Sequence, residues 1–294
     1  MVASPSRSEG ERARDPAVAK VGFIGLGEMG GAIATRIIRA GWPTVLWARR
    51  PDVLAEFVAP NVTSAGTPRE VAAEADLIGI CVWADADVRE VLVGETGVLA
   101  DCRPGTIVAI HSTVLPRTCR EIASAARDRG VFVIDAPVTG GRDVALAGSL
   151  AIATGGDSAA ITRARPVFEA FASRIVRVGD VGGGQVAKLL NNALFAANVA
   201  VADDALTLGA AVGVDTTELA QFLRDGSGRS YGLDIAERFR ASADTRQAAL
   251  PALDKDVRSL ADEAAAEGLD SASLRSAAAE AVRRLRDPPP GWLA

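Results

Sequence analysis

The chain has 294 residues, of which 49% are apolar and only 4% aromatic, and it carries a net charge of −5. A chain of this length exceeds one compact core, so we expect one large and one smaller domain. The acidic balance, without a basic stripe, argues against a nucleic-acid partner. No run of about 18 apolar residues predicts a membrane span. Three cysteines without a CxxC pair are typical of a cytoplasmic protein, and we expect no metal site.

The two ends of the chain are predicted to lie outside the fold. Residues 1–18 mix charges with Ser, Pro and Gly and cannot bury enough surface to offset chain entropy, so we predict a disordered tail. Pro288-Pro289-Pro290 cannot continue a helix, so residues 288–294 are predicted as a short second tail. The predicted domains are residues 19–181 and 182–287.

Short apolar runs alternate with helical segments through the first domain. We predict strands at 21–24, 44–47, 61–64, 77–82, 106–110, 131–134, 150–153 and 175–178. Helices are predicted at 86–93, 116–129 and 159–172. Another begins at the capping box Thr67-Pro68-Arg69-Glu70, which has proline at the first helical position. The alternation predicts an α/β fold with a doubly wound parallel sheet, the Rossmann arrangement.

A glycine-rich turn follows the first strand and opens a helix, in the run Gly25-Leu26-Gly27-Glu28-Met29-Gly30. This context predicts dinucleotide binding. Gly25 permits the tight turn, Gly27 lets the backbone approach a pyrophosphate, and Gly30 lets the helix pack close to the sheet. The phosphates would face the helix N-terminus. A glycine turn without a ligand is the alternative interpretation.

The end of the second strand bears on the choice of cofactor. Arg49 and Arg50 stand where an NAD enzyme usually has an acid for the ribose hydroxyls. A guanidinium matches a phosphate in a bidentate way, so the pair favours NADP, with NAD as the alternative. The opposing interpretation is that both arginines are solvated and that Asp52 contacts the ribose.

Ligands of such sheets lie beyond the carboxyl ends of the strands. Residues expected at this crevice are Ala84, Asp85, His111, Ser112 and Thr113. After the next strand, Thr139-Gly140-Gly141 offers a hydroxyl and successive unhindered N–H groups, which suit a carboxylate. An ordinary glycine turn is an equally good interpretation of this segment.

The apolar period changes to three and four residues from Gln185 onward. It predicts one helix over 185–212, about 40 Å long, as the spine of an all-helical second domain. Further helices are predicted at 216–224, 232–241, 253–267 and 271–285. Lys188 and Asn192 lie four residues apart, so their side chains share one helix face and can converge on a small molecule. A solvated surface lysine is the alternative.

Four ordered motifs together resemble the β-hydroxyacid dehydrogenase family, which includes 3-hydroxyisobutyrate dehydrogenases, tartronate semialdehyde reductases and glyoxylate reductases. The motifs are GFIGLGEMG at 22–30, DAPVTGG at 135–141, GGGQVAKLLNN at 182–192 and LDKDVRSLA at 253–261. The resemblance covers nearly everything after the first tail. It implies an active site between the two domains and a homodimer or homotetramer built through the helices.

The resemblance also implies roles for individual residues. Lys188 would be catalytic, Asn192 would orient the substrate, and Lys255 would lie near the nicotinamide, with Asp256 beside it structural. The substrate carboxylate would be held by Thr139, Gly140 and Gly141, with Ser112 nearby. Val82, Trp83 and Thr113 would line the cofactor site.

The chemistry expected of Lys188 places a demand on its pKa. Its ammonium would stabilise the oxygen that gains charge during carbonyl reduction and deliver a proton to it. In oxidation the same group must take the proton back, for which an ordinary lysine pKa of about 10.4 is poorly matched. Burial and the positive end of its own helix both disfavour the charged form, so we predict a lowered pKa.

Three departures from the family pattern border the expected site. His111 replaces the usual Asp, Arg142-Asp143 replaces a small or apolar pair, and Ala248 and Ala249 lie where an aromatic residue is common. His111 is either a second proton donor or, as we favour, a histidine that caps a strand end. Two other functions remain alternatives: an imine reductase, which typically replaces the lysine, and a non-catalytic NADPH-binding module.

Overall fold

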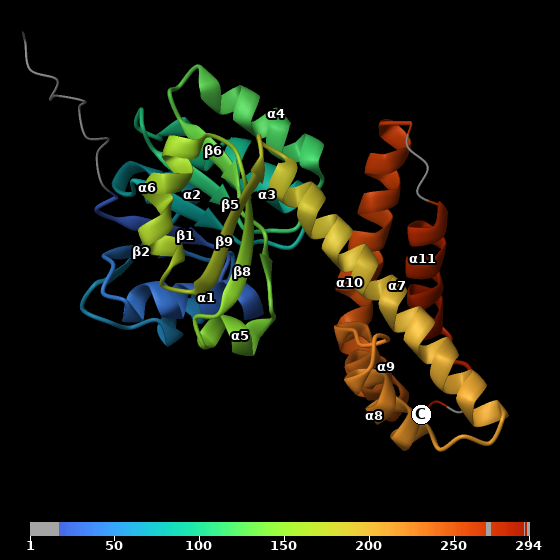
Figure 1. Ribbon diagram of the computed structural model, residues 1–294. Helices are drawn as coiled ribbons and strands as arrows, with labels where there is room; N and C mark the ends of the chain where they lie inside the picture. The colour runs from blue at the N-terminus through green and yellow to red at the C-terminus, as the bar shows by residue number, and fades with distance from the viewer. Residues whose placement is uncertain (1–17, 269–271, 291, 293–294) are drawn as a thin grey trace, which may run out of the picture.

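The computed structural model describes residues 18–268, 272–290 and 292. A sheet domain is followed by a helical domain built around one long helix, as Figure 1 shows, which confirms the predicted fold class. Residues 1–17, predicted as a disordered tail, lie outside the described residues. Val18, assigned to that tail, is only 7% exposed and packs in the core of the sheet domain.

The sheet runs in the order β3-β2-β1-β4-β5-β6-β8-β7, and β9 pairs with β8. Its strands are β1 (Val21–Ile24), β2 (Thr44–Trp47), β3 (Val62–Ser64), β4 (Leu77–Ile80), β5 (Ile107–Ile110), β6 (Phe132–Asp135), β7 (Val138–Thr139), β8 (Leu150–Gly155) and β9 (Ala172–Gly179). Strands β1 to β6 pair in parallel, but β8 is antiparallel to β6 and β7. The prediction of a wholly parallel sheet is therefore wrong at this edge. Residues 136–149 form β7, a glycine turn and a five-residue helix and make no crossover helix, so the chain returns antiparallel.

Two apolar layers cover the faces of the sheet. The helices of this domain are α1 (Glu28–Arg39), α2 (Pro68–Glu74), α3 (Asp85–Val93), α4 (Pro116–Arg127), α5 (Arg142–Leu146) and α6 (Ser158–Phe168), with 3-10 turns at Pro51–Glu56 and Val98–Ala100. Phe23, Ile33 and Phe168 belong to the layer beneath α1 and α6. Val71 and Ile122 belong to the opposite layer, beneath α2 to α4. This double cover accounts for strands that are buried on both faces.

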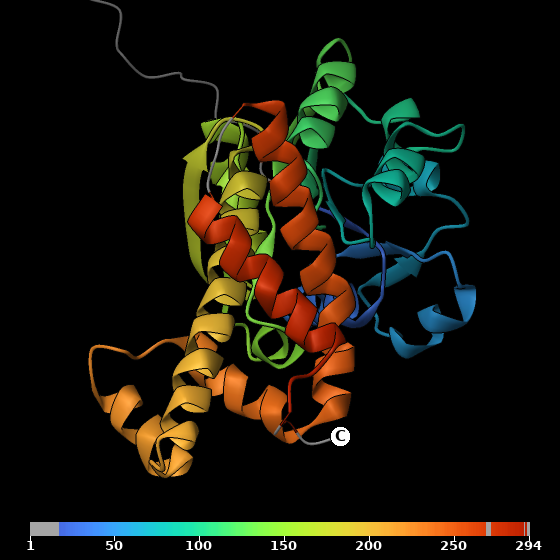
Figure 2. The same ribbon diagram turned by 90° about the vertical axis from the view of Figure 1, so that its right-hand side faces the viewer.

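The helical domain is built around α7, which leaves the sheet domain and runs the length of the helical domain (Figures 1 and 2). Its helices are α7 (Gly183–Ala211), α8 (Thr216–Asp225), α9 (Tyr231–Ala241), α10 (Ala243–Ala266) and α11 (Ala272–Arg286). Leu189, Val199 and Phe239 belong to their shared core. The predicted start of α10 at residue 253 is wrong. Ser242 caps the helix by accepting the Thr245 N–H at 3.2 Å, and the helix continues across Pro251.

Helix α7 is long and apolar enough to cross a membrane if length and composition alone are considered. No membrane-spanning segment was expected from the sequence. In the structure 44% of the most apolar stretch of α7 is buried, and α9, α10 and α11 pack against this helix. A core helix of a helical domain has the same composition, and this packing accounts for it.

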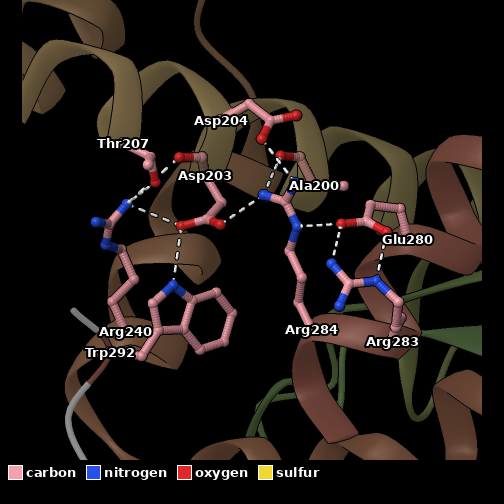
Figure 3. A network of polar contacts seen from close by, with 9 residues as sticks. All are labelled: Ala200, Asp203, Asp204, Thr207, Arg240, Glu280, Arg283, Arg284 and Trp292. Atoms are coloured by element: carbon pink, nitrogen blue, oxygen red, sulfur yellow. Dashed lines mark hydrogen bonds and ion pairs between the residues drawn. The ribbon is translucent and has the colours of Figure 1, made fainter. Parts of the chain in front are cut away.

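One buried carboxylate ties together three helices and the segment after them (Figure 3). Asp203 of α7 is 1% exposed and accepts hydrogen bonds from Arg240 at 2.8 Å and Arg284 at 2.6 Å. It also accepts the indole N–H of Trp292 at 3.1 Å. The guanidinium of Arg246 lies 5.4 Å from the ring of Trp292. Trp292 is therefore packed against the helical domain, although the sequence predicted a tail there.

Candidate active site

A cavity of about 570 Å³ lies beyond the carboxyl ends of β1, β2 and β4. It is lined by the residues predicted to bind the cofactor, namely Gly25, Leu26, Gly27, Glu28, Met29, Gly30, Arg49, Arg50, Val82 and Trp83. Thr113 and Lys255, the other two residues predicted for the cofactor, lie beside this cavity rather than in its wall. We call it the dinucleotide cavity.

The three glycines of the turn each meet a different steric requirement. Gly25 has φ 93°, and a Cβ there would lie 2.3 Å from the Cys81 carbonyl oxygen. A Cβ at Gly30 would lie 2.0 Å from the Gly25 oxygen, so this glycine lets the helix start pack against the turn. At Gly27 a Cβ would meet nothing within 4 Å, because that position faces open space. The turn therefore fits a pyrophosphate at the start of α1.

The two arginines after β2 differ in their surroundings. Arg49 Nη2 donates to Asp87 Oδ1 at 2.8 Å and to Glu90 Oε2 at 2.9 Å, both on α3. The hydrogen bond and the charge of Asp87 raise the pKa of Arg49. Arg50 is exposed, and its side chain makes no hydrogen bond or ion pair with the residues that the structure describes. Only Arg50 is thus free to meet a phosphate without breaking an existing contact.

Asp135, at the end of β6, anchors the start of α7. Its Oδ1 accepts the Gly182 N–H at 2.7 Å and its Oδ2 the Gln185 N–H at 2.8 Å. A Cβ at Gly184 would lie 2.8 Å from Asp135 Oδ2, so a residue without a side chain fits here. Burial raises the pKa of Asp135. No function was assigned to Asp135 from the sequence. The signal was recognisable, because an acid follows a strand and a later glycine run opens a helix.

Gln185 and Ser112 join the start of α7 to the loop after β5. The fully buried Gln185 side chain donates to the Ser112 carbonyl at 2.9 Å and accepts the Val114 N–H at 3.1 Å. The Ser112 hydroxyl accepts the Val82 N–H at 2.8 Å and is itself buried. The Ser112 hydroxyl thus holds two loops together, and its substrate-binding role stays a prediction.

His111 is a core residue. It is 3% exposed, its Nδ1 lies 2.8 Å from the Ala136 carbonyl oxygen, and its ring stacks on Phe23. The edges of Phe168 and Phe171 enclose it further. Burial lowers the pKa of His111 to about 4. The imidazole is neutral at physiological pH and faces the core, so the expectation that it faces the crevice is wrong, as is the alternative of a second proton donor.

Four polar residues of α7 and α10 meet at the seam between the domains. Asn192 Nδ2 donates to Asp256 Oδ2 at 2.5 Å, and Lys255 Nζ lies 3.2 Å from Asp256 Oδ1. Lys188 is half-buried, and this burial lowers its pKa. Asp256 opposes the shift and Lys255 adds to it. The direction agrees with the prediction for Lys188.

Asp256 does more than the structural role expected of it. It is 4% exposed, and its Oδ1 accepts no hydrogen bond from the described part of the chain. Its charge acts on Lys188, its Oδ2 orients Asn192, and Lys255 is its ion-pair partner. Asp256 therefore interacts with each of the other three polar residues at this seam.

Lys255 connects this group to the dinucleotide cavity. Its Nζ donates to the Thr113 carbonyl oxygen at 2.5 Å and lies 5.7 Å from the centre of the Trp83 ring, which lines the cavity. Farther along the same seam, Arg120 of α4 pairs with Glu263 of α10 at 2.8 Å. Lys255 and Trp83 thus join the polar residues of α7 and α10 to the dinucleotide cavity.

Thr139, Gly140 and Gly141 lie where β7 gives way to α5. Gly140 has φ 137° and Gly141 φ 84°, which are conformations that favour glycine. Arg142 is exposed and lies 3.8 Å from Asp143, its neighbour in the chain. The carboxylate-binding role of this turn stays a prediction.

Comparison with known proteins assigns the chain to a family. A model of the NAD binding domain of 6-phosphogluconate dehydrogenase matches residues 20–179. A second, described as NAD-binding of NADP-dependent 3-hydroxyisobutyrate dehydrogenase, matches residues 182–287. The chain belongs to the β-hydroxyacid dehydrogenase family. As a β-hydroxyacid dehydrogenase it is an oxidoreductase with a nicotinamide cofactor.

Individual relatives of this β-hydroxyacid dehydrogenase agree with the assignment. It is 34% identical to the NAD-dependent L-serine dehydrogenase of Pseudomonas aeruginosa, over 90% of this chain and 92% of that protein. It is 37% identical to a probable mitochondrial 3-hydroxyisobutyrate dehydrogenase of Dictyostelium discoideum, over 73% of this chain and 67% of that one. The solved structure of Mycobacterium tuberculosis 3-hydroxyisobutyrate dehydrogenase with L-serine superposes with a TM-score of 0.80 at 27% identity, over 92% of this chain and 94% of that one.

Imine reductases share the fold at a greater distance. The structure of the Streptomyces aurantiacus enzyme superposes with a TM-score of 0.63 at 20% identity, covering 93% of this chain and 95% of that one. At this identity the likeness shows the fold alone. The relatives therefore favour hydroxy acid chemistry over imine reduction.

Proposed function

We propose that this β-hydroxyacid dehydrogenase prefers NADP(H) and interconverts a small hydroxy acid and its semialdehyde or oxo acid, with Lys188 as general acid and base. The observation that carries the proposal is the half-buried Lys188, with its lowered pKa, in a group of polar residues that Lys255 joins to the dinucleotide cavity. A solvated surface lysine would have neither property.

Lys188 performs the proton transfers of the proposed reaction. When bound, the nicotinamide supplies or takes up the hydride at the reacting carbon. In reduction, the Lys188 ammonium donates a hydrogen bond to the carbonyl oxygen and then gives it a proton. In oxidation the neutral amine removes the hydroxyl proton, a step that its lowered pKa favours. Asp256 stabilises the ammonium form and so opposes the lowering of the Lys188 pKa.

Neighbouring residues would hold the substrate in reach of Lys188. The Asn192 amide is fixed by Asp256 at 2.5 Å and would orient the carbonyl or hydroxyl oxygen of the substrate. The hydroxyl of Thr139 and the N–H groups of Gly140 and Gly141 would bind the carboxylate. Relatives that are named for L-serine and for 3-hydroxyisobutyrate support a short acid with a terminal hydroxymethyl group.

The proposed oligomeric state and location rest on the exposed side chains of α7 and on the cysteines. Apolar side chains stay exposed along α7, from 36% at Val186 to 65% at Leu208. They support a homodimer or homotetramer in which α7 packs against a second copy. The three cysteines, Cys81, Cys102 and Cys119, are all free thiols, which supports a cytoplasmic location.

A substrate panel tests the proposed activity. L-serine, 3-hydroxyisobutyrate and glycerate are offered with NADP+ and NAD+, and short semialdehydes, 2-oxo acids and cyclic imines are offered with NADPH, while the absorbance of the reduced nicotinamide is followed. We expect turnover of at least one hydroxy acid and a higher kcat/KM with NADP+ than with NAD+. Turnover of cyclic imines alone would favour an imine reductase. NADPH binding without turnover of any compound would favour a non-catalytic module.

A further inference from the structure

The acidic face of α3 competes with the cofactor for Arg49. Asp87 and Glu90 both accept hydrogen bonds from Arg49 Nη2, so two carboxylates surround one guanidinium. With Arg50 included, this corner of the dinucleotide cavity holds two positive and two negative side chains. Two free arginines would attract a phosphate strongly, whereas this balanced group attracts it far less.

Arg50 is the better placed of the two arginines for a phosphate. It lines the cavity and is exposed, and its guanidinium has no partner among the described residues. Pro51 follows it and begins a 3-10 turn, and the backbone of Arg50 is extended, with φ −104° and ψ 106°. A residue before proline is held in this region, so the direction in which the Arg50 side chain leaves the strand end is restricted.

Glu90 and Asp87 differ in what else they do. Asp87 Oδ2 also accepts the Ala84 N–H at 3.1 Å, and this bond caps α3. The Glu90 side chain is 69% exposed, and the contacts found for its carboxylate go to Arg49. Loss of the Glu90 charge would therefore change the electrostatics of the corner without disturbing the helix.

We propose that Glu90 is a specificity-determining residue for the cofactor: it holds Arg49 against α3 and leaves Arg50 as the main ligand of a 2′-phosphate. The inference rests on the proposed function, because it requires that the cavity binds a nicotinamide dinucleotide. It goes beyond that function in predicting that the preference for NADP is restrained by this chain's own acid and can be strengthened by its removal.

The test uses two nucleotide fragments that lack the nicotinamide, so it does not depend on turnover. Binding of 2′,5′-ADP and of 5′-AMP to the full-length protein is measured by calorimetry, and the ratio of the two dissociation constants reports the contribution of the 2′-phosphate. Glu90→Gln should increase the preference for 2′,5′-ADP about three- to fivefold, as expected for the release of an exposed ion pair. The control Glu95→Gln removes an equally exposed acid just beyond α3 and should leave the ratio unchanged.

The arginine variants complete the test. Arg50→Ala should reduce the preference about tenfold, which is the loss of one charge-assisted contact. Arg49→Ala should reduce it less. An unchanged ratio in Glu90→Gln, or a larger loss in Arg49→Ala than in Arg50→Ala, would overturn the inference while the proposed function stands. If the unaltered protein binds neither fragment nor NADPH, both fail together.

Discussion

Lysine is rare in this chain, and its placement is informative. Of the 32 basic residues only three are lysines, at positions 20, 188 and 255. Arginine does not lose its proton in proteins, whereas a buried lysine readily shifts its pKa. Two of the three lysines lie at the seam between the domains. A chain that otherwise uses arginine thus has lysine at the position for which we propose proton transfer.

This difference gives a test of Lys188. Lys188→Arg keeps the positive charge but cannot accept a proton, so hydroxy acid oxidation should fall at least about a hundredfold, while NADPH binding, followed by fluorescence, is retained. In the unaltered enzyme the oxidation rate should rise with pH and level off below the ordinary lysine pKa of about 10.4, because burial lowers the pKa of Lys188. The control Lys20→Arg preserves a surface ion pair with Glu74 and should leave the rate unchanged. Near-normal oxidation by Lys188→Arg would remove this residue from the mechanism.

The same burial makes Lys188 costly for stability. Its pKa is lower in the folded than in the unfolded chain, so the unfolded chain binds more protons and stability rises as the pH approaches the ordinary lysine pKa. Lys188→Met removes this cost. We expect the variant to melt above the unaltered protein at pH 7, with the difference shrinking toward pH 10. Calorimetry at both pH values measures it, and a variant that melts lower at pH 7 would contradict the argument.

At the residue scale, the sequence predicted the candidate catalytic and binding residues better than the residues that support them. Lys188, Asn192 and the glycines of the first turn belong to local patterns, in which spacing alone sets the geometry. His111 and Ser112 were placed in the crevice because they follow a strand, yet their side chains are used inside the protein. Their direction depends on packing partners far along the chain, such as Phe168, and no local spacing reveals it.

At the scale of elements, the key junction is the one between β6 and α7. Asp135 accepts the two N–H groups at the start of α7, and Lys188 projects from the next turn of the same helix. A shift of this helix start would displace the Lys188 ammonium. The position of the proposed catalytic group therefore depends on a carboxylate in the sheet domain.

Asp135→Asn tests this junction. An amide offers one acceptor where the carboxylate offers two, so one buried N–H loses its partner, and unfolding should become easier by about 1–3 kcal/mol. We also expect a fall in kcat with little change in cofactor binding. The matched control is Asp157→Asn, which alters an exposed cap of α6 that accepts the Ala160 N–H at 2.8 Å. Because Asn caps a helix about as well as Asp, that control should change stability little and leave kcat unchanged. If both variants keep full kcat, Asp135 does not position the lysine.

Element prediction succeeded where local signals agreed and failed where topology decided. Thr67 caps α2 by accepting the Glu70 N–H at 3.2 Å, as the capping box predicted. The antiparallel β8 was missed because strand direction depends on how the connection crosses the sheet, which no run of apolar residues records. The early start of α10 was missed because Pro251 resembles a helix boundary, although the helix tolerates it.

At the scale of the whole molecule, α7 presents an apolar surface that nothing in the described chain covers. Leu190, Leu194 and Val201 are 43%, 56% and 61% exposed. The double variant Leu194→Glu with Leu208→Glu should convert a dimer or tetramer into monomers, measured by light scattering after gel filtration. Val93→Glu, at a 49% exposed site on α3, is the control and should not change the assembly. Assembly that survives the double variant would place the contact elsewhere.

The Asp203 network has a practical consequence for anyone who shortens the chain. The region matched by the family model ends at residue 287, and a protein trimmed there would lose Trp292 and its hydrogen bond to Asp203. Water would then reach a carboxylate that is now enclosed, and Arg246 would lose the indole face beside it. Trimmed preparations should therefore keep the last seven positions, and a purification tag belongs in front of the chain rather than after Trp292.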